Sequence, residues 1–150
     1  MSLIYKKMDL FDAPKGSILV HACNAKGVWG SGIAKEMNKR FPDAFAHYRT
    51  SCLQKKMLSY YDYQYDSQYY IASLVTSGGY GTDVDNQKEI LLNTSKALID
   101  FLGYVQDSDH QIYSNKFNSG LFKVPWVETE DILKRVVEAF NIDWIVCEQG

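Results

Sequence analysis

Three loops that contain glycine are the segments of this chain best suited to bind a ligand. The first, GVWGSG at 27–32, separates the apolar run SILV (17–20) from the helix-like IAKEMNKRF (33–41). The other two are SGGYG at 77–81 and NSG at 118–120. Glycines let the backbone approach a ligand closely, and the N–H groups at the start of a helix attract anions. The loops therefore predict an anion site at the carboxyl ends of strands.

The familiar phosphate motifs do not account for these loops. The P-loop pattern GxxxxGK[ST] is absent, and the dinucleotide pattern GxGxxG is only half matched, because Lys35 stands where its third glycine would fall. A single glycine loop is more often only a tight turn. Three loops at one edge favour a diphosphate held by backbone amides and helix N-termini, which requires no Lys or Arg.

Strand-like and helix-like segments alternate along the chain, as the positioning of such loops requires. The strand-like segments are 3–8, 17–22, 56–63, 68–76, 111–117 and 143–149. Helical spacing or capping residues predict helices at 33–40, from Asp43, after Asp85 and from Pro125. This alternation predicts an α/β fold, a three-layer α/β/α sandwich with a central mixed, mostly parallel sheet, whose three loops converge on one edge.

Length, charge and cysteine content narrow the classes of partner. The 150 residues suit one domain (1–150), and 16 basic against 18 acidic residues, without a basic run, argue against nucleic acid. No apolar stretch approaches the roughly 20 residues of a membrane helix. Cys23, Cys52 and Cys147 are scattered, which indicates neither a disulfide framework nor a zinc site. We expect a cytoplasmic monomer that uses no metal or cofactor.

Two segments together carry a family resemblance. ILVHACNAKGVWGSGIAKEMNKRFPDAF (18–45) and NSGLFKVPWVETEDIL (118–133) resemble macrodomains, and most closely the ADP-ribose-1″-phosphate phosphatase branch. The resemblance runs from about residue 3 to the C-terminus. It implies a macrodomain-like fold and, as ligand, ADP-ribose or its 1″-phosphate.

The resemblance also implies a set of binding residues. The acid that binds adenine corresponds to Asp9, with the Leu10 N–H beside it, although Met8 stands where most macrodomains have glycine. Asn24, near Ala22, corresponds to the asparagine of the distal ribose. The two phosphate loops correspond to Gly30, Ser31, Gly32 and Ile33, and to Ser119, Gly120, Leu121 and Phe122. Tyr80 and Phe122 are expected to cover the distal ribose, and Trp29 either lines the cleft or packs in the core.

For catalysis, the phosphatase branch is matched at His21 and Asp83. Hydrolysis of a phosphomonoester without metal requires a group that activates water or attacks, and a group that protonates the leaving oxygen. We expect Asp83 in the first role and His21 in the second, with their order open. The simpler alternative is a strand histidine bonded to a carbonyl, and an aspartate that caps a turn.

Two other functions remain as alternatives. The related branch that removes ADP-ribose from protein glutamate uses a Lys in the middle loop and an Asp after the G-L pair, but Ser77 and Phe122 stand at those positions. Hydrolysis of O-acetyl-ADP-ribose by a bound water and Asn24 stays open. The third possibility is a non-catalytic module that only binds ADP-ribose.

Overall fold

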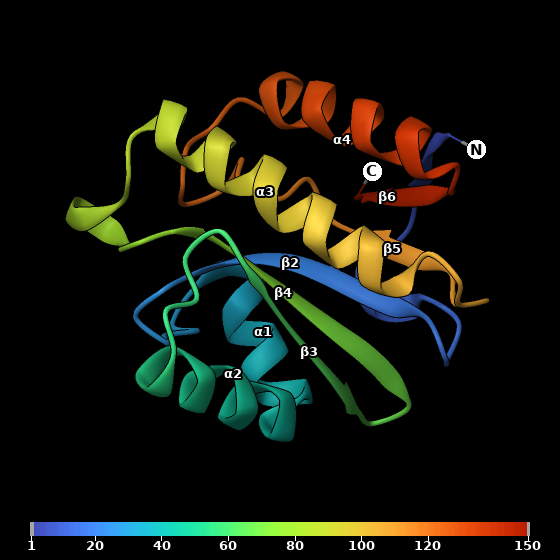
Figure 1. The fold of residues 1–150 in the computed structure, drawn as a ribbon. Coiled ribbons are helices and arrows are strands. Elements are labelled where there is room, and N and C mark those ends of the chain that lie inside the picture. Colours follow the sequence, from blue (N-terminus) through green and yellow to red (C-terminus); the bar gives the residue numbers. More distant parts are fainter. Residues whose placement is uncertain (1, 150) are drawn as a thin grey trace.

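The computed structural model describes residues 2–149, which form a six-stranded sheet flanked by helices (Figure 1). The strands lie in the order β1-β6-β5-β2-β4-β3. Every neighbouring pair is parallel except β3 and β4, which form an antiparallel hairpin. Their bounds are β1 Leu3–Lys7, β2 Ile18–Asn24, β3 Tyr61–Asp66, β4 Tyr69–Ser77, β5 Ile112–Ser114 and β6 Trp144–Glu148.

Helices cover both faces of this sheet. Figure 1 shows α1 (Gly32–Arg40) and α2 (Pro42–Gln54) on one face, and α3 (Gln87–Val105) and α4 (Trp126–Phe140) on the other. Short 3₁₀ turns occupy Leu10–Asp12 and Gly81–Asp83. The predicted three-layer α/β/α sandwich with a mixed, mostly parallel sheet is confirmed. Within residues 2–149, no helix is both long and apolar enough to cross a bilayer.

The central strand β2 is buried on both sides and divides the core into two clusters. Ile18 and Val20 pack with the residues of α3 and α4, whereas Leu19 and Cys23 pack with those of α1 and α2. Because successive side chains of a strand point to opposite faces, this one strand supplies both clusters. Its carboxyl end is thereby fixed between the two helical layers.

Some predicted boundaries are wrong, and each difference has a local cause. β3 begins at Tyr61 because Ser59 takes a positive φ of 66° and the preceding residues form a turn. β5 is only three residues long, since the chain leaves the sheet at Asn115. The cap of α3 is Asn86, whose side chain accepts from the Glu89 N–H at 2.9 Å. The predicted cap, Asp85, instead accepts from the Gly78 N–H at 2.8 Å.

Helix α2 is capped by a residue distant in sequence. Phe41, at the N-cap position, offers no side-chain hydrogen bond. The Asp66 carboxylate, at the end of β3, accepts from the N–H groups of Asp43 and Ala44, both at 3.0 Å. Because Asp66 is almost fully buried, this contact fixes the β3–β4 hairpin to the start of α2.

Replacement of this cap should destabilise the protein measurably. We expect Asp66→Ala to lower the free energy of unfolding by about 1–3 kcal/mol, because the N–H groups of Asp43 and the buried Ala44 lose their acceptor. Asp66→Asn, which keeps one acceptor oxygen, should lose less. Urea denaturation followed by circular dichroism measures both. Equal stability of the alanine variant and the wild type would contradict this account of how α2 begins.

Candidate functional site

Two adjoining pockets form a cleft at the carboxyl edge of the sheet. The first, here called the Asp9 pocket, has a volume of about 450 Å³. The second, the glycine-loop pocket, has about 930 Å³ and lies among the three glycine-rich loops. Gly32, Ile33 and Asn115 line both, so the two pockets share a wall. Both volumes lie within the range of small-molecule sites, roughly 300–1,000 Å³.

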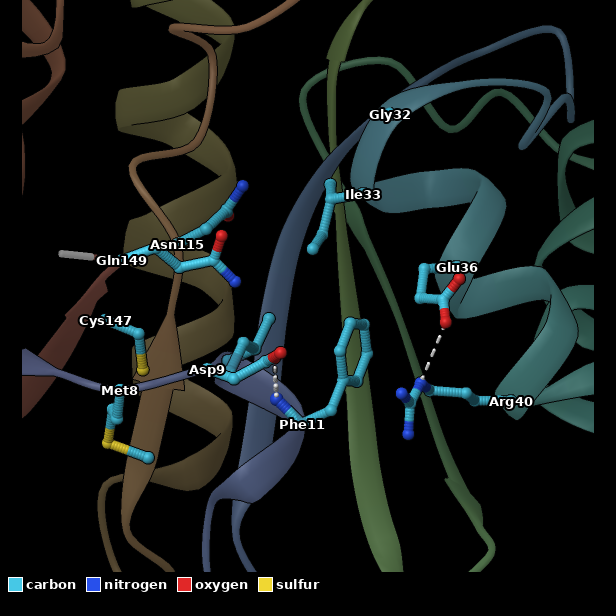
Figure 2. A pocket seen from close by; sticks show the side chains of 11 residues that line it. Met8, Asp9, Phe11, Gly32, Ile33, Glu36, Arg40, Asn115, Cys147 and Gln149 are labelled. Atoms are coloured by element: carbon cyan, nitrogen blue, oxygen red, sulfur yellow. Dashed lines mark hydrogen bonds and ion pairs between the residues drawn. The ribbon is translucent and has the colours of Figure 1, made fainter.

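The Asp9 pocket places a carboxylate opposite an ion pair. Asp9 Oδ1 accepts from the Phe11 N–H at 2.9 Å, so one carboxylate oxygen holds the turn after β1. Figure 2 shows Asn115 and Gln149 on the strand side of the pocket, with Glu36 and Arg40 of α1 on the other. The Arg40 guanidinium lies 4.4 Å from the centre of the Phe11 ring and 3.3 Å from Glu36 Oε1.

The first glycine loop delivers the N-terminus of α1 to the shared wall. Gly32 takes a positive φ of 61°, which disfavours any residue with a Cβ. Ser31, at the N-cap, makes no side-chain bond to the first turn of α1, so its hydroxyl does not compete there for the N–H groups. Asn24 shapes the loop, because its Nδ2 donates to the Val28 carbonyl at 2.8 Å and its Oδ1 accepts from the Lys26 N–H at 3.0 Å.

The third loop is fixed by Asn118. Asn118 Oδ1 accepts from the Thr76 hydroxyl, and its Nδ2 donates to Thr94 Oγ1, both at 2.8 Å. Its carbonyl also accepts from the Val124 N–H at 2.9 Å, which closes the loop. These bonds hold the turn that presents Gly120, Leu121 and Phe122 to the glycine-loop pocket.

The middle loop is held equally firmly. The Ser77 hydroxyl donates to the Gly79 carbonyl at 2.7 Å and accepts from the Asp85 N–H at 3.1 Å. A Cβ on Gly79 would lie only 2.4 Å from the Asp83 carbonyl oxygen, so the close turn requires glycine. The loop brings Tyr80 and Thr82 to the pocket wall.

The charge of the glycine-loop pocket suits an anion. Among its described lining residues, Lys116 and Lys123 are the charged ones, and none is Asp or Glu. Lys116 Nζ also forms an ion pair with Glu148 Oε2 at 2.8 Å. Glu148 thus offsets the charge of Lys116, whereas Lys123 adds positive potential to that of the loop amides.

Most of the predicted binding residues come together in this cleft. Asp9 and Leu10 line the Asp9 pocket. The glycine-loop pocket is lined by Ala22, Asn24, Gly30, Ser31, Gly32, Ile33, Tyr80, Gly120, Leu121 and Phe122. Segments far apart in the sequence thus meet as the alternation of strands and helices predicted.

The structure corrects the predicted placement of His21 and Trp29, which line neither pocket. His21 is fully buried, its Nε2 lies 2.9 Å from Ser73 Oγ, and its ring packs edge-on against Trp29 at 4.6 Å. Desolvation lowers the pKa of His21 to about 3, so the ring is neutral and cannot serve as an acid near neutral pH. Trp29 stacks on Tyr48 at 5.0 Å as part of the core.

Asp83 and Ser119 also do not line the cleft. Asp83 is exposed at the end of the 3₁₀ turn, directly after Thr82, which does line it. The Ser119 hydroxyl turns back and donates to the Lys116 carbonyl. Asp83 is therefore next to the site, whereas the Ser119 side chain supports its loop.

Several lining residues were missed in the sequence. Glu36 and Arg40 follow Ile33 by three and seven positions, so helical periodicity would have placed all three on one face of α1. Asn115 and Lys116 directly follow β5, and the carboxyl end of that strand points to the cleft. Asn115 and Lys116 were missed because the predicted strand, 111–117, continued past Ser114, where β5 ends, and so included them in the sheet.

Comparisons with known proteins agree with this geometry. The model of a family described as Macro domain matches residues 20–133, more than half of the chain. The chain belongs to the Macro domain family. Two relatives of this macrodomain, from Aspergillus oryzae and Meyerozyma guilliermondii, are named ADP-ribose 1″-phosphate phosphatase. The Aspergillus oryzae relative is 31% identical, over 92% of this chain and 89% of its own length. The Meyerozyma guilliermondii relative is also 31% identical, over 93% of this chain and 97% of its own length.

Solved structures show the same fold at lower identity. A macrodomain protein from Streptomyces coelicolor has a TM-score of 0.79 at 18% identity and covers 99% of both chains. The macrodomain of Thermus aquaticus DarG has a TM-score of 0.81 at 21% identity, over 97% of both chains. A Thermosipho africanus DarTG structure in complex with ADP-ribose has a TM-score of 0.79 at 15% identity, over 98% of this chain and 42% of that one.

The buried state of His21 predicts a pH effect on stability. Its pKa of about 3 in the folded protein lies below the ordinary value of 6.5, so between these values only the unfolded chain takes up the proton. Stability from this group is therefore complete above pH 6.5 and falls as the pH drops toward 3. From pH 7 to pH 5 we expect the loss to be about 2 kcal/mol.

Urea denaturation at the two pH values measures this effect, with His21→Gln as the comparison because glutamine does not titrate. The wild type should lose about 2 kcal/mol more than the variant between pH 7 and pH 5. Identical pH dependence of the two proteins would contradict the buried, neutral imidazole.

Proposed function

We propose that this macrodomain binds ADP-ribose derivatives and removes the phosphate from ADP-ribose 1″-phosphate. The observation that carries the proposal is the cleft. Among the described residues, its glycine-loop pocket is lined by lysines and by no carboxylate, and it adjoins the Asp9 pocket, where only one oxygen of the Asp9 carboxylate accepts a hydrogen bond. The two relatives named for this reaction, each about as long as the matched region, support it.

Each part of such a ligand would have its own place along the two pockets. The free oxygen of Asp9 would accept from the adenine amino group, beside Leu10. The N-terminal N–H groups of α1 and the loop at Gly120 would bind the diphosphate from opposite sides. The distal ribose would then lie in the remainder of the glycine-loop pocket, near Asn24, Tyr80 and Phe122.

The chemistry we propose differs from the sequence-based expectation in one role. Asp83 would activate the attacking water, because it directly follows Thr82 at the pocket wall. Lys123 and the loop amides would stabilise the charge of the transferred phosphoryl group. His21 has no role in this scheme because it is buried, so the leaving oxygen takes its proton from solvent at the open side near Tyr80, which is 49% exposed.

Phosphate release from ADP-ribose 1″-phosphate tests this function. We expect Asp83→Asn to lower turnover about 10²- to 10⁴-fold, because the amide cannot take a proton from water. Its affinity for ADP-ribose, measured by calorimetry, should stay within about threefold of the wild type. Asp107→Asn, which changes an exposed carboxylate after α3, is the matched control and should keep wild-type turnover.

Two results would contradict parts of the proposal. Tight ADP-ribose binding without phosphate release by the wild type would make the protein a binding module or a hydrolase of another ester. Full turnover by Asp83→Asn would remove Asp83 from the reaction and leave the binding function intact.

Adenine recognition predicts a change of base preference. Asp9→Asn keeps an oxygen for the Phe11 N–H but places an NH₂ group where the carboxylate accepted. We expect this variant to bind ADP-ribose about tenfold more weakly, and to bind the hypoxanthine analogue, which offers a carbonyl oxygen there, more tightly than ADP-ribose. Calorimetry with both ligands measures the preference. An unchanged preference would exclude Asp9 from base recognition.

We further propose that the protein works as a cytoplasmic monomer on small molecules and not on nucleic acid. The free thiols of Cys23, Cys52 and Cys147 suit a reducing compartment. The balanced overall charge argues against a polyanion as partner.

A further inference from the structure

Two asparagines that follow β5, Asn115 and Asn118, differ in the hydrogen bonds that their side chains make. Asn118 uses both ends of its carboxamide, in bonds to Thr76 and Thr94. Asn115 does not: its Oδ1 is buried and has no hydrogen-bond partner among the residues that the structure describes. Asn115 is also one of the three residues that line both pockets. Its amide therefore lies at the junction of the cleft with an unfilled bonding capacity.

The position of Asn115 is fixed by its neighbours. The Trp144 indole N–H donates to Ser114 Oγ at 2.8 Å, and the Ser114 hydroxyl donates to the Asn115 carbonyl, also at 2.8 Å. On the other side, the ion pair between Lys116 and Glu148 ties the chain to the end of β6. The backbone at Asn115 is thus held from both sides. A buried amide oxygen without a partner destabilises a fold, and residues of this kind are expected at functional sites.

We propose that the Asn115 carboxamide binds the hydroxyl groups of the adenosine ribose and selects ligands that carry them. This inference rests on the proposed function. With adenine at Asp9 and the diphosphate at the glycine loops, the covalent order of ADP-ribose places the adenosine ribose between them. The residues between the two pockets are Gly32, Ile33 and Asn115, and Asn115 alone of these three has a polar side chain.

The chemistry of the two groups is complementary. A carboxamide offers a donor and an acceptor, and a ribose diol both donates and accepts, so either end of the amide finds a partner. A diphosphate has only acceptors and would leave Oδ1 unpaired. Figure 2 shows the Asn115 amide directed into the Asp9 pocket, across from Ile33. A ligand that lacks the hydroxyl would leave the buried amide oxygen without this partner, which is the basis of the selection.

The test compares Asn115→Leu with the wild type on three ligands: ADP-ribose and its analogues that lack the 2′- or the 3′-hydroxyl of the adenosine ribose. We expect the wild type to bind ADP-ribose about tenfold more tightly than at least one deoxy analogue. The leucine variant, similar in size but without polar atoms, should bind all three with equal affinity. Equal preference for ADP-ribose in both proteins would overturn the inference.

Thermal unfolding without ligand separates binding from a structural role. Asn115→Leu should unfold at the same temperature as the wild type or higher, because it removes an unpaired buried oxygen. Asn118→Leu is the matched control and should unfold at a lower temperature, because the buried Thr76 hydroxyl loses its acceptor and Thr94 Oγ1 loses a donor. A comparable loss in both variants would make Asn115 structural and overturn the inference.

The outcomes also separate this inference from the function on which it rests. A wild type that binds ADP-ribose but does not distinguish the deoxy analogues overturns only the role of Asn115. A wild type that does not bind ADP-ribose at all overturns the proposed function and this inference together.

Discussion

The hydrogen bonds of Asn118 are the interaction on which the cleft depends most. Its side chain joins Thr76 of β4, Thr94 of α3 and, at 3.4 Å, Thr129 of α4, while its carbonyl closes the third loop at Val124. One buried amide thus ties the sheet to the two helices of one layer at the edge where two of the glycine loops begin. Because these bonds are buried and complete, loss of any one would leave a polar group unpaired, so the loops keep their spacing.

Two polar groups at the cleft lack the hydrogen bonds that similar groups make elsewhere in the described part of the chain. Away from the cleft, two helix starts receive acceptors, because Asn86 caps α3 and Asp66 caps α2 across the fold, whereas α4 begins after Pro125 without a side-chain cap. At the cleft, Ser31 leaves the start of α1 without a side-chain cap, and Asn115 keeps an unpaired oxygen. Among the described residues, Trp29 Nε1 is likewise buried without a partner, in the core cluster. Ser31 and Asn115 differ from it because they line the cleft, where a ligand can supply the missing partner.

The sequence predicted the architecture well because its signals are local and periodic. Glycine loops after strands and helical spacing located nearly every element. The failures concern residues whose surroundings come from distant parts of the chain. His21 lies in β2, which is buried on both faces, so no alternation of polar and apolar residues revealed which way its ring points. The resemblance supplied a role for His21, but Trp29 and Ser73 surround it on folding. Similarly, Asp66 is distant from α2 in the sequence, so only the folded structure shows that it caps this helix.

The burial of Trp29 and Tyr48 also supports the first glycine loop, where we propose that an anion binds. Trp29 stacks on Tyr48, and the Tyr48 hydroxyl donates to the Asn24 carbonyl beneath the first glycine loop. Desolvation raises the pKa of Tyr48 far above its ordinary value, so this hydroxyl keeps its proton and the bond persists at any physiological pH. The loop is therefore supported by packing, and its N–H groups need little rearrangement when an anion binds. Preorganised donors of this kind stabilise negative charge without the cost of desolvating a charged side chain at each contact.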